Sequence, residues 1–123
     1  MLTHWGTPPG LGSGPLRSAG KTKGKIVNSE PVVLINAFEV PEREDEAFIA
    51  GWERARAFLS TQPGYISTCL HRSLSPSAEF RFVNVALWQS ARAFQDATSQ
   101  PQFADMAIPY KFHPTLYAVV REG

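Results

Sequence analysis

The sequence contains a single cysteine, Cys69, among its 123 residues. A lone cysteine cannot form a disulfide within the chain, and its isolation excludes a CxxC redox pair and a cysteine-rich zinc site. The net charge is also small, because 12 basic and 11 acidic residues leave a formal charge of +1. A balance this close to neutrality argues against a dedicated nucleic-acid-binding protein.

Long apolar runs are absent as well. No stretch approaches the roughly 18–20 apolar residues of a membrane-spanning helix, and the first 30 residues lack the apolar core of about 7–15 residues found in secretory signals. We therefore expect no membrane partner and a cytoplasmic location, which suits a chain without disulfides. Hydrophobic residues still make up 43% of the chain, enough for a packed core.

Residues 1–30 differ in composition from the remainder. They contain six glycines and the pair Pro8-Pro9, and they show no apolar periodicity. Four basic residues in this stretch are accompanied by no acid before Glu30. Such a segment buries too little apolar surface to offset its ordering entropy. We predict a flexible tail over 1–30, or a start codon assigned too far upstream, and a single domain over 31–123; a basic arm for an anionic partner is the weaker alternative.

The remaining chain predicts strands alternating with helices. A helix is expected over 42–62, because Phe48, Trp52, Ala55 and Leu59 recur at spacings of four, three and four. Strands are expected at 32–40, 65–73, 80–88 and 115–122, and further helical pieces at 91–98 and 102–108. The order β-α-β-β-α-β predicts an α+β, ferredoxin-like fold, in which an antiparallel sheet carries both helices on one face.

Both faces of the predicted sheet are apolar. In the first strand, one face would carry Val33, Ile35 and Ala37, and the other face Val32, Leu34, Asn36 and Phe38. The helices can cover only one of these faces, so the other needs a partner. We therefore predict a homodimer that packs sheet against sheet.

Several motifs occur in this order along residues 31–123: VLINAFEV (33–40), EDEAFIAGW (44–52), PGYIST (63–68), LHRSL (70–74), FVNVALWQSARAF (82–94) and FADMAIPY (103–110). Together they resemble the antibiotic biosynthesis monooxygenase family, whose members form dimeric α+β barrels. The resemblance covers about three quarters of the chain. It implies a pocket between the sheet and the two helices of one subunit, and it maps the family's first-strand asparagine onto Asn36.

The resemblance implies two kinds of chemistry. Some members oxidise phenols or anthrones to quinones with dioxygen, using no prosthetic group or metal, whereas others bind and degrade haem. The haem-degrading branch pairs the first-strand asparagine with a Trp and a His on the second helix. Residues 89–108 contain neither residue type, which argues against haem degradation by that mechanism.

Three polar residues are candidates for the chemistry. Asn36 interrupts an apolar strand, and its amide could hold a substrate oxygen or a developing oxyanion; the alternative is a structural hydrogen bond. Asn84 falls on the face of Trp88, where it could serve the pocket or bond a neighbouring strand. His71, expected on the face of Tyr65, could act as a general base or be an ordinary half-exposed residue.

The resulting hypothesis is a cofactor-free monooxygenase. His71 would take a proton from a phenol or an acidic C–H, Asn36 and Asn84 would stabilise the anion, and the carbanion would reduce dioxygen directly. The hydrophobic aromatic substrate would be bound by Phe38, Trp52, Phe82, Trp88 and Phe94, with Tyr110 and His113 at the mouth. The sequence shows no metal-ligand spacing and no nucleotide-binding loop, so we expect no cofactor. The alternative is a stress-response or binding module that captures a small molecule without turnover.

Overall fold

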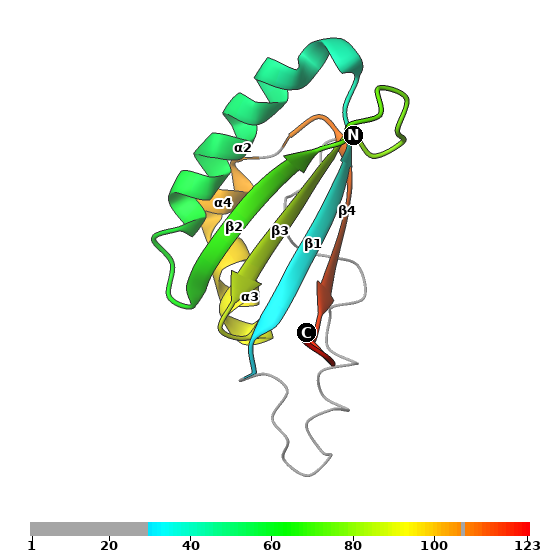
Figure 1. Cartoon of the computed structure of the whole chain (residues 1–123). Helices are drawn as coiled ribbons and strands as arrows, with labels where there is room; N and C mark the ends of the chain where they lie inside the picture. Colours follow the sequence, from blue (N-terminus) through cyan, green and yellow to red (C-terminus); the bar gives the residue numbers. More distant parts are fainter. Residues whose placement is uncertain (1–29, 107) are drawn as a thin grey trace.

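The computed structural model describes residues 30–106 and 108–123, so the predicted tail lies outside the described residues except for Glu30. The elements are β1 (Val32–Glu39), the 3-10 turn η2 (Glu42–Glu44), α2 (Asp45–Leu59), β2 (Tyr65–Arg72), β3 (Phe82–Trp88), α3 (Ala91–Thr98), α4 (Pro101–Ala104) and β4 (Lys111–Tyr117) (Figure 1). None of the helices in these ranges has the length and apolar character needed to cross a bilayer.

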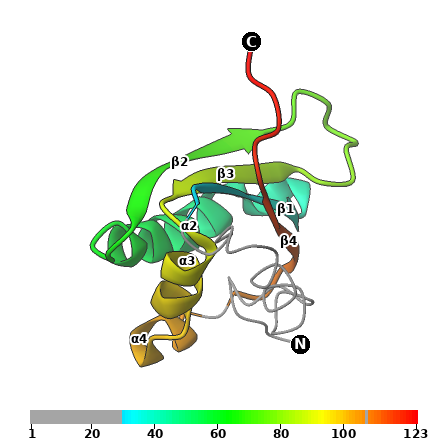
Figure 2. The ribbon, with the colours of Figure 1, turned by 90° about the horizontal axis from the view of Figure 1, so that it is seen from below.

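The four strands form one sheet in the order β2-β3-β1-β4. Each neighbouring pair is antiparallel. Helices α2, α3 and α4 all lie on one face of this sheet, and the opposite face carries no helix (Figure 2). This arrangement confirms the predicted α+β, ferredoxin-like fold.

Strand alternation separates the two faces. In β1 the side chains of Val32, Leu34, Asn36 and Phe38 are buried beneath the helices, and those between them are half-buried on the other side, which we call the outer face. The core on the helical side is strongly aromatic. The ring of Phe48 from α2 lies 4.8 Å from that of Phe38 and 4.7 Å from that of Phe82. Burying each such ring contributes about 1.5–3 kcal/mol, which fixes α2 against the sheet.

The last strand lies earlier than the sequence predicts. We expected residues 115–122, but β4 covers Lys111–Tyr117 and includes Pro114. The prediction was wrong because it began the strand only after Pro114. Proline lacks the N–H that a central strand needs, yet β4 is an edge strand with only β1 as a neighbour, where Pro114 sits opposite Asn36.

A register shift in β2 changes which residues share a face. Tyr65 pairs with Trp88, and Ser67 pairs with Leu87, the residue adjacent to Trp88 in β3. Ile66 is therefore an extra residue in β2 at this point of the ladder. Such a bulge reverses the alternation. Tyr65 therefore packs in the core on the helical side, whereas His71, opposite the half-buried Val83, lies on the outer face. The prediction that these two residues share a face was wrong for this reason.

An ion-pair cluster ties the start of α2 to the sheet. The carboxylate of Asp45 accepts hydrogen bonds from Arg81 at 2.7 and 2.9 Å and from Arg72 at 3.3 Å. The bonds from Arg81 hold the pKa of Asp45 below its ordinary value of 3.8. Because Asp45 is in the first turn of α2, its charge also suits the helix dipole.

Two glycines should respond to alanine in opposite ways. Gly64, in the turn before β2, has a φ of +92°, and an added Cβ would overlap that of Ala93. We expect Gly64→Ala to lower the free energy of unfolding by about 1–3 kcal/mol. Gly51 lies inside α2, where a new Cβ meets only ordinary contacts, so Gly51→Ala should raise it by about 0.5–1 kcal/mol. Urea denaturation measures both, and equal effects would contradict the assigned backbone.

The Asp45 cluster predicts a pH dependence. A carboxyl whose pKa is lowered on folding stabilises the protein above the unfolded pKa, and this contribution is lost as the pH falls through the folded pKa. Asp45→Asn should therefore lower the melting temperature at pH 7 by roughly a few degrees. The difference in melting temperature between this variant and the unsubstituted protein should shrink as the pH falls below 3.8.

The matched control is Glu46→Gln, which removes the same charge from the next, exposed residue of α2. Calorimetric scans between pH 2.5 and 7 test the pair. A gap for Asp45→Asn that is independent of pH, or an equal gap for Glu46→Gln, contradicts the assignment.

Candidate functional site

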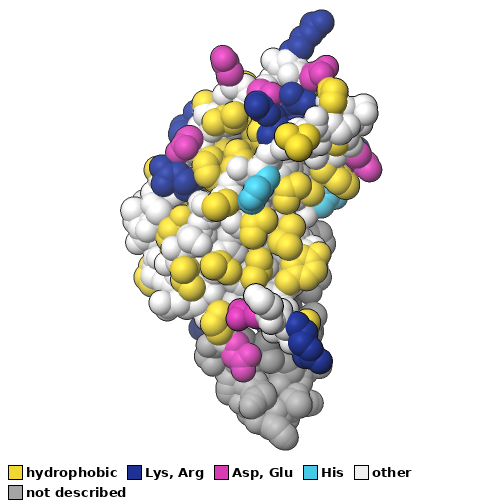
Figure 3. All heavy atoms as spheres, viewed as in Figure 1, with side chains coloured by type: hydrophobic (Ala, Val, Ile, Leu, Met, Phe, Trp, Pro, Cys, Tyr) yellow, Lys and Arg dark blue, Asp and Glu magenta, His cyan; other side chains and the backbone are white. Residues whose placement is uncertain are grey.

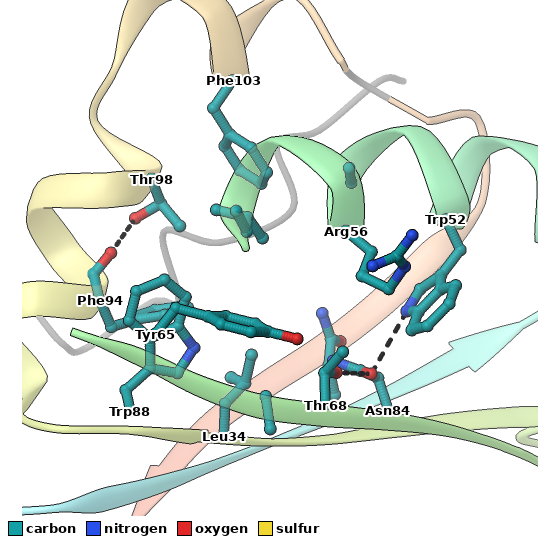
Figure 4. A pocket seen from close by; sticks show the side chains of 14 residues that line it. Leu34, Trp52, Arg56, Tyr65, Thr68, Asn84, Trp88, Phe94, Thr98 and Phe103 are labelled. Carbon is teal, nitrogen blue, oxygen red and sulfur yellow. Dashed lines mark hydrogen bonds between the residues drawn. The ribbon is translucent and has the colours of Figure 1, made fainter. Parts of the chain in front are cut away.

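A cavity lies between the sheet and the helices (Figure 4). Strands β1, β2 and β3 supply its floor, and α2, α3 and α4 supply its roof and one wall. Including its open mouth it encloses about 440 Å³. It is lined by Leu34, Asn36, Trp52, Ala55, Arg56, Leu59, Tyr65, Thr68, Asn84, Ala86, Trp88, Phe94, Thr98 and Phe103.

Two carboxamides lie side by side in the floor. Asn36 of β1 and Asn84 of β3 are direct partners across the antiparallel ladder. Their exposed fractions are only 1% and 7%. In each strand, the apolar residues two positions before and two positions after the asparagine point to the same helical face. They pack around the amides and bury them. The cavity therefore offers two amide groups at one place in an otherwise apolar surface.

Hydrogen bonds fix the orientation of the Asn84 amide. Its Oδ1 atom accepts from Thr68 Oγ1 at 2.7 Å and from Trp52 Nε1 at 3.3 Å (Figure 4). Two donors on one oxygen identify that atom as the carbonyl, so the Nδ2 group is turned away from them. That group is the part of Asn84 left to donate to a ligand.

Aromatic rings form the wall at the other end of the cavity. Trp88 is 1% exposed, and its ring lies 5.6 Å from that of Tyr65 and 5.6 Å from that of Phe94, both in edge-to-face geometry. Interlocked rings of this kind are stabilised beyond their buried area. They provide a rigid apolar surface for a flat ligand beside the two amides.

The closed interior is small, with room for about two or three water molecules. Arg56, Leu59 and Tyr65 are only half-buried, and they border the open part of the cavity. The deeper residues, Asn36, Trp88 and Phe94, are each about 1% exposed.

The charges around the cavity are few. Arg56 is the single charged side chain among the described residues that line it, and no Asp, Glu, His or Cys is among them. Within residues 30–106 and 108–123, no group of three His, Cys, Asp or Glu side chains could hold a metal ion.

The structure brings together five of the residues predicted for the site: Asn36, Trp52, Asn84, Trp88 and Phe94 all line the cavity. Phe38 and Phe82 do not line it. They pack in the neighbouring aromatic core around Phe48, towards the other end of the sheet.

The two histidines lie elsewhere. His71 contacts the backbone oxygen of Val83 through Nδ1 at 3.2 Å on the outer face. His113 pairs with Glu39 at 2.8 Å and packs against the ring of Phe80. His113 lies opposite Ala37, so it is also on the outer face. Neither histidine lines the cavity of its own chain.

Tyr110 is also remote from the cavity. Its hydroxyl donates to Glu44 at 2.8 Å near the start of α2. Burial, aided by this carboxylate, raises the pKa of Tyr110 to about 12. The phenol therefore stays protonated at neutral pH, and its hydrogen bond connects the segment before β4 with η2.

Sequence reasoning missed four polar residues of the site, one of which is Thr98 of α3, whose hydroxyl donates to the backbone oxygen of Phe94. Arg56 follows Trp52 by four positions and so lies beside the apolar face of α2, a signal that could have been read. Tyr65 and Thr68 both face the cavity because of the bulge between them, and no local pattern revealed that bulge.

The family model described as antibiotic biosynthesis monooxygenase matches residues 31–107, more than half of the chain. A deoxynogalonate monooxygenase from Streptomyces nogalater is 32% identical over 77 residues, which is 63% of this chain and 63% of that relative's length. The match thus spans less than two thirds of that protein.

Solved structures agree on the fold. A protein of Shewanella loihica PV-4, provisionally named a monooxygenase, is 42% identical with a TM-score of 0.70, covering 76% of this chain and 98% of its own. SnoaB, a cofactor-independent oxygenase from Streptomyces nogalater, is 23% identical with a TM-score of 0.62, covering 76% and 96%. At that identity SnoaB shows the fold alone.

A haem-degrading protein, MhuD from Mycobacterium tuberculosis, is 29% identical with a TM-score of 0.56, covering 75% of this chain and 98% of its own. Among the described residues, no histidine, cysteine or methionine lines the present cavity, and Tyr65 is the single lining side chain of a type that ligates haem iron.

The fold, the paired asparagines beneath the helices and the match over residues 31–107 agree. The chain belongs to the antibiotic biosynthesis monooxygenase family.

Proposed function

We propose that this protein is a cofactor-independent monooxygenase that oxidises an electron-rich phenol or anthrone to a quinone with dioxygen. The observation that carries the proposal is the pair of buried amides, Asn36 and Asn84, beside an aromatic wall in one cavity. The name of one relative, a deoxynogalonate monooxygenase, supports the same class of reaction.

The first step is ionisation of the substrate. An anthrone loses a proton from its CH₂ group, and the negative charge moves to the carbonyl oxygen as an enolate. Amide donors held in place before the reaction stabilise such an oxyanion without reorganisation. Asn84 can donate through Nδ2, because Oδ1 is held by Thr68 and Trp52, and Asn36 is its direct neighbour across the ladder.

The second step is oxidation of the anion by dioxygen. The enolate transfers one electron to O₂, and the resulting substrate radical and superoxide combine to form a C–O bond. The O–O bond of this peroxide then breaks as the remaining C–H proton passes to the departing oxygen, which leaves as hydroxide. Hydroxide and the proton released first form water, so anthrone and O₂ yield anthraquinone and H₂O.

For the proton of the first step, the lining residues that the structure describes offer no carboxylate or imidazole acceptor. His71, expected from the sequence to act as the base, lies on the outer face. The proposal therefore gives His71 no role in the cavity of its own chain. The proton leaves to water at the mouth, and the amides favour this ionisation by stabilising the anion.

We also propose that a second copy of the chain covers the outer face. Apolar side chains gather on this face in Figure 3, and Leu87 and Tyr117 on it are 39% and 49% exposed. Beyond β4, the segment with Val119 and Val120 projects away from the helices on the same side (Figure 2). A two-fold axis through the face would bury both the strands and these segments against their own copies.

The site predicts loss of oxygen uptake in Asn36→Ala. With an anthrone or hydroquinone substrate and no added cofactor, the metal-free protein should consume oxygen. We expect turnover to fall by about a hundredfold or more in the variant, the loss typical when one oxyanion donor is removed. An oxygen electrode measures the rate, and circular dichroism checks that the variant is folded.

The matched control is Gln89→Ala, which removes a carboxamide from an exposed position one residue after β3 and should leave uptake unchanged. Undiminished uptake in Asn36→Ala would keep the enzyme but contradict the site. If a substrate panel binds and none is oxidised, the alternative of a binding module without turnover is favoured instead.

The proposed dimer predicts a mass of twice the 13.6-kDa chain by light scattering after gel filtration. Leu87→Glu places a carboxylate on the outer face and should yield single chains. Ala57→Glu places the same group on the exposed side of α2 and should leave the dimer intact. A monomeric parent protein, or a dimer that survives Leu87→Glu, contradicts the arrangement.

A further inference from the structure

We propose that Arg56 binds a carboxylate of the substrate at the mouth of the cavity, so that the preferred substrate is an aromatic acid anion. This inference concerns the cavity of the proposed function and names the class of molecule that it accepts. It is carried by the position and bonding of one side chain on α2.

The first observation is the charge of the lining. Among the fourteen described residues that line the cavity, Arg56 alone is charged, and none of the fourteen is acidic. The other polar groups there are amides, hydroxyls and the indoles of Trp52 and Trp88, which are neutral. A cation beside an apolar, poorly hydrated space attracts an anion more strongly than the same cation in open water does.

The second observation is the depth of Arg56. Its side chain is 39% exposed, whereas Asn36 is 1% exposed. Figure 4 shows the guanidinium of Arg56 beside Trp52, reaching from α2 towards the sheet. A flat ligand with its reacting oxygen at the amides would thus extend past the guanidinium on its way out. A charged substituent on the outer ring would meet Arg56.

The third observation is the bonding of the guanidinium. Arg56 Nε donates to Glu53 at 2.9 Å, one turn earlier on the helix. This bond engages one of the five N–H donors and leaves those on Nη1 and Nη2, the end of the fork that binds a carboxylate through two parallel bonds. Glu53 is 52% exposed and does not line the cavity. The Glu53 carboxylate partly offsets the positive charge of Arg56, and its hydrogen bond holds the guanidinium in one orientation.

A purely structural role for Arg56 would be a surface ion pair with Glu53. Exposed pairs of this kind at i,i+3 spacing contribute little to stability. Removing Arg56 should therefore leave the fold intact, so that binding can be measured in the variant. Arg54, an exposed residue on the same helix that does not line the cavity, provides the matched control.

The test uses two product-like probes that do not react, anthraquinone-2-carboxylate and anthraquinone-2-carboxamide. They have nearly the same shape and differ in charge. Quenching of tryptophan fluorescence reports binding, because Trp52 and Trp88 both line the cavity. Dissociation constants are measured for the unsubstituted protein, Arg56→Gln, Arg56→Lys and Arg54→Gln at fixed ionic strength.

We expect the unsubstituted protein to bind the carboxylate about tenfold more tightly than the carboxamide, the effect of a hydrogen-bonded charge pair. Arg56→Gln should abolish this preference while changing the carboxamide affinity less than about twofold. Arg56→Lys should keep part of the preference, and Arg54→Gln should keep all of it.

A preference that persists in Arg56→Gln overturns the proposal, and so does an equal loss of affinity for both probes. Absence of a carboxylate preference in the unsubstituted protein, including failure to bind either probe, overturns it too. These outcomes are independent of oxygen uptake. A protein that consumes no oxygen can still show the Arg56-dependent preference, and an active oxygenase can lack it.

Discussion

The hydrogen bonds to Asn84 Oδ1 are the constraint around which the site is arranged. A buried amide oxygen left without donors would cost about 1–3 kcal/mol, and here Thr68 from β2 and Trp52 from α2 both supply one. These bonds connect an edge strand, a central strand and the helix above them. Arg56 lies one turn after Trp52 on α2, so the helix orientation that places the Trp52 indole at Asn84 also places Arg56 at the cavity.

The pleat of the sheet separates two surfaces of different composition. On the helical face, Asn36 and Asn84 adjoin apolar and aromatic residues, which leaves a site with preset dipoles and little water. On the outer face, half-exposed aliphatic side chains and the two described histidines form a surface of a different kind. Because alternate residues of one strand serve both faces, changes in β1 or β3 can be directed at one surface without touching the other.

The mouth and the floor of the cavity differ in exposure as well as in charge. The amides and Trp88 are almost fully buried, whereas Arg56, Leu59 and Tyr65 are half-buried. A small closed interior excludes water from the amides, which strengthens their effect on an anion. Under the proposed function, a ligand meets the charge of Arg56 at the entrance and the amides at the floor.

The sequence by itself determined the order of the elements and much of the floor. Alternation placed Asn84 and Trp88 on one face, and helical spacing placed Trp52 beneath α2, because each pattern depends only on local geometry. Tertiary structure decided the rest. The bulge after Tyr65 placed Thr68 at the cavity and His71 on the outer face, and the edge position of β4 accommodated Pro114. Strand register and helix rotation arise from contacts between residues far apart in the chain, and no local pattern encodes them.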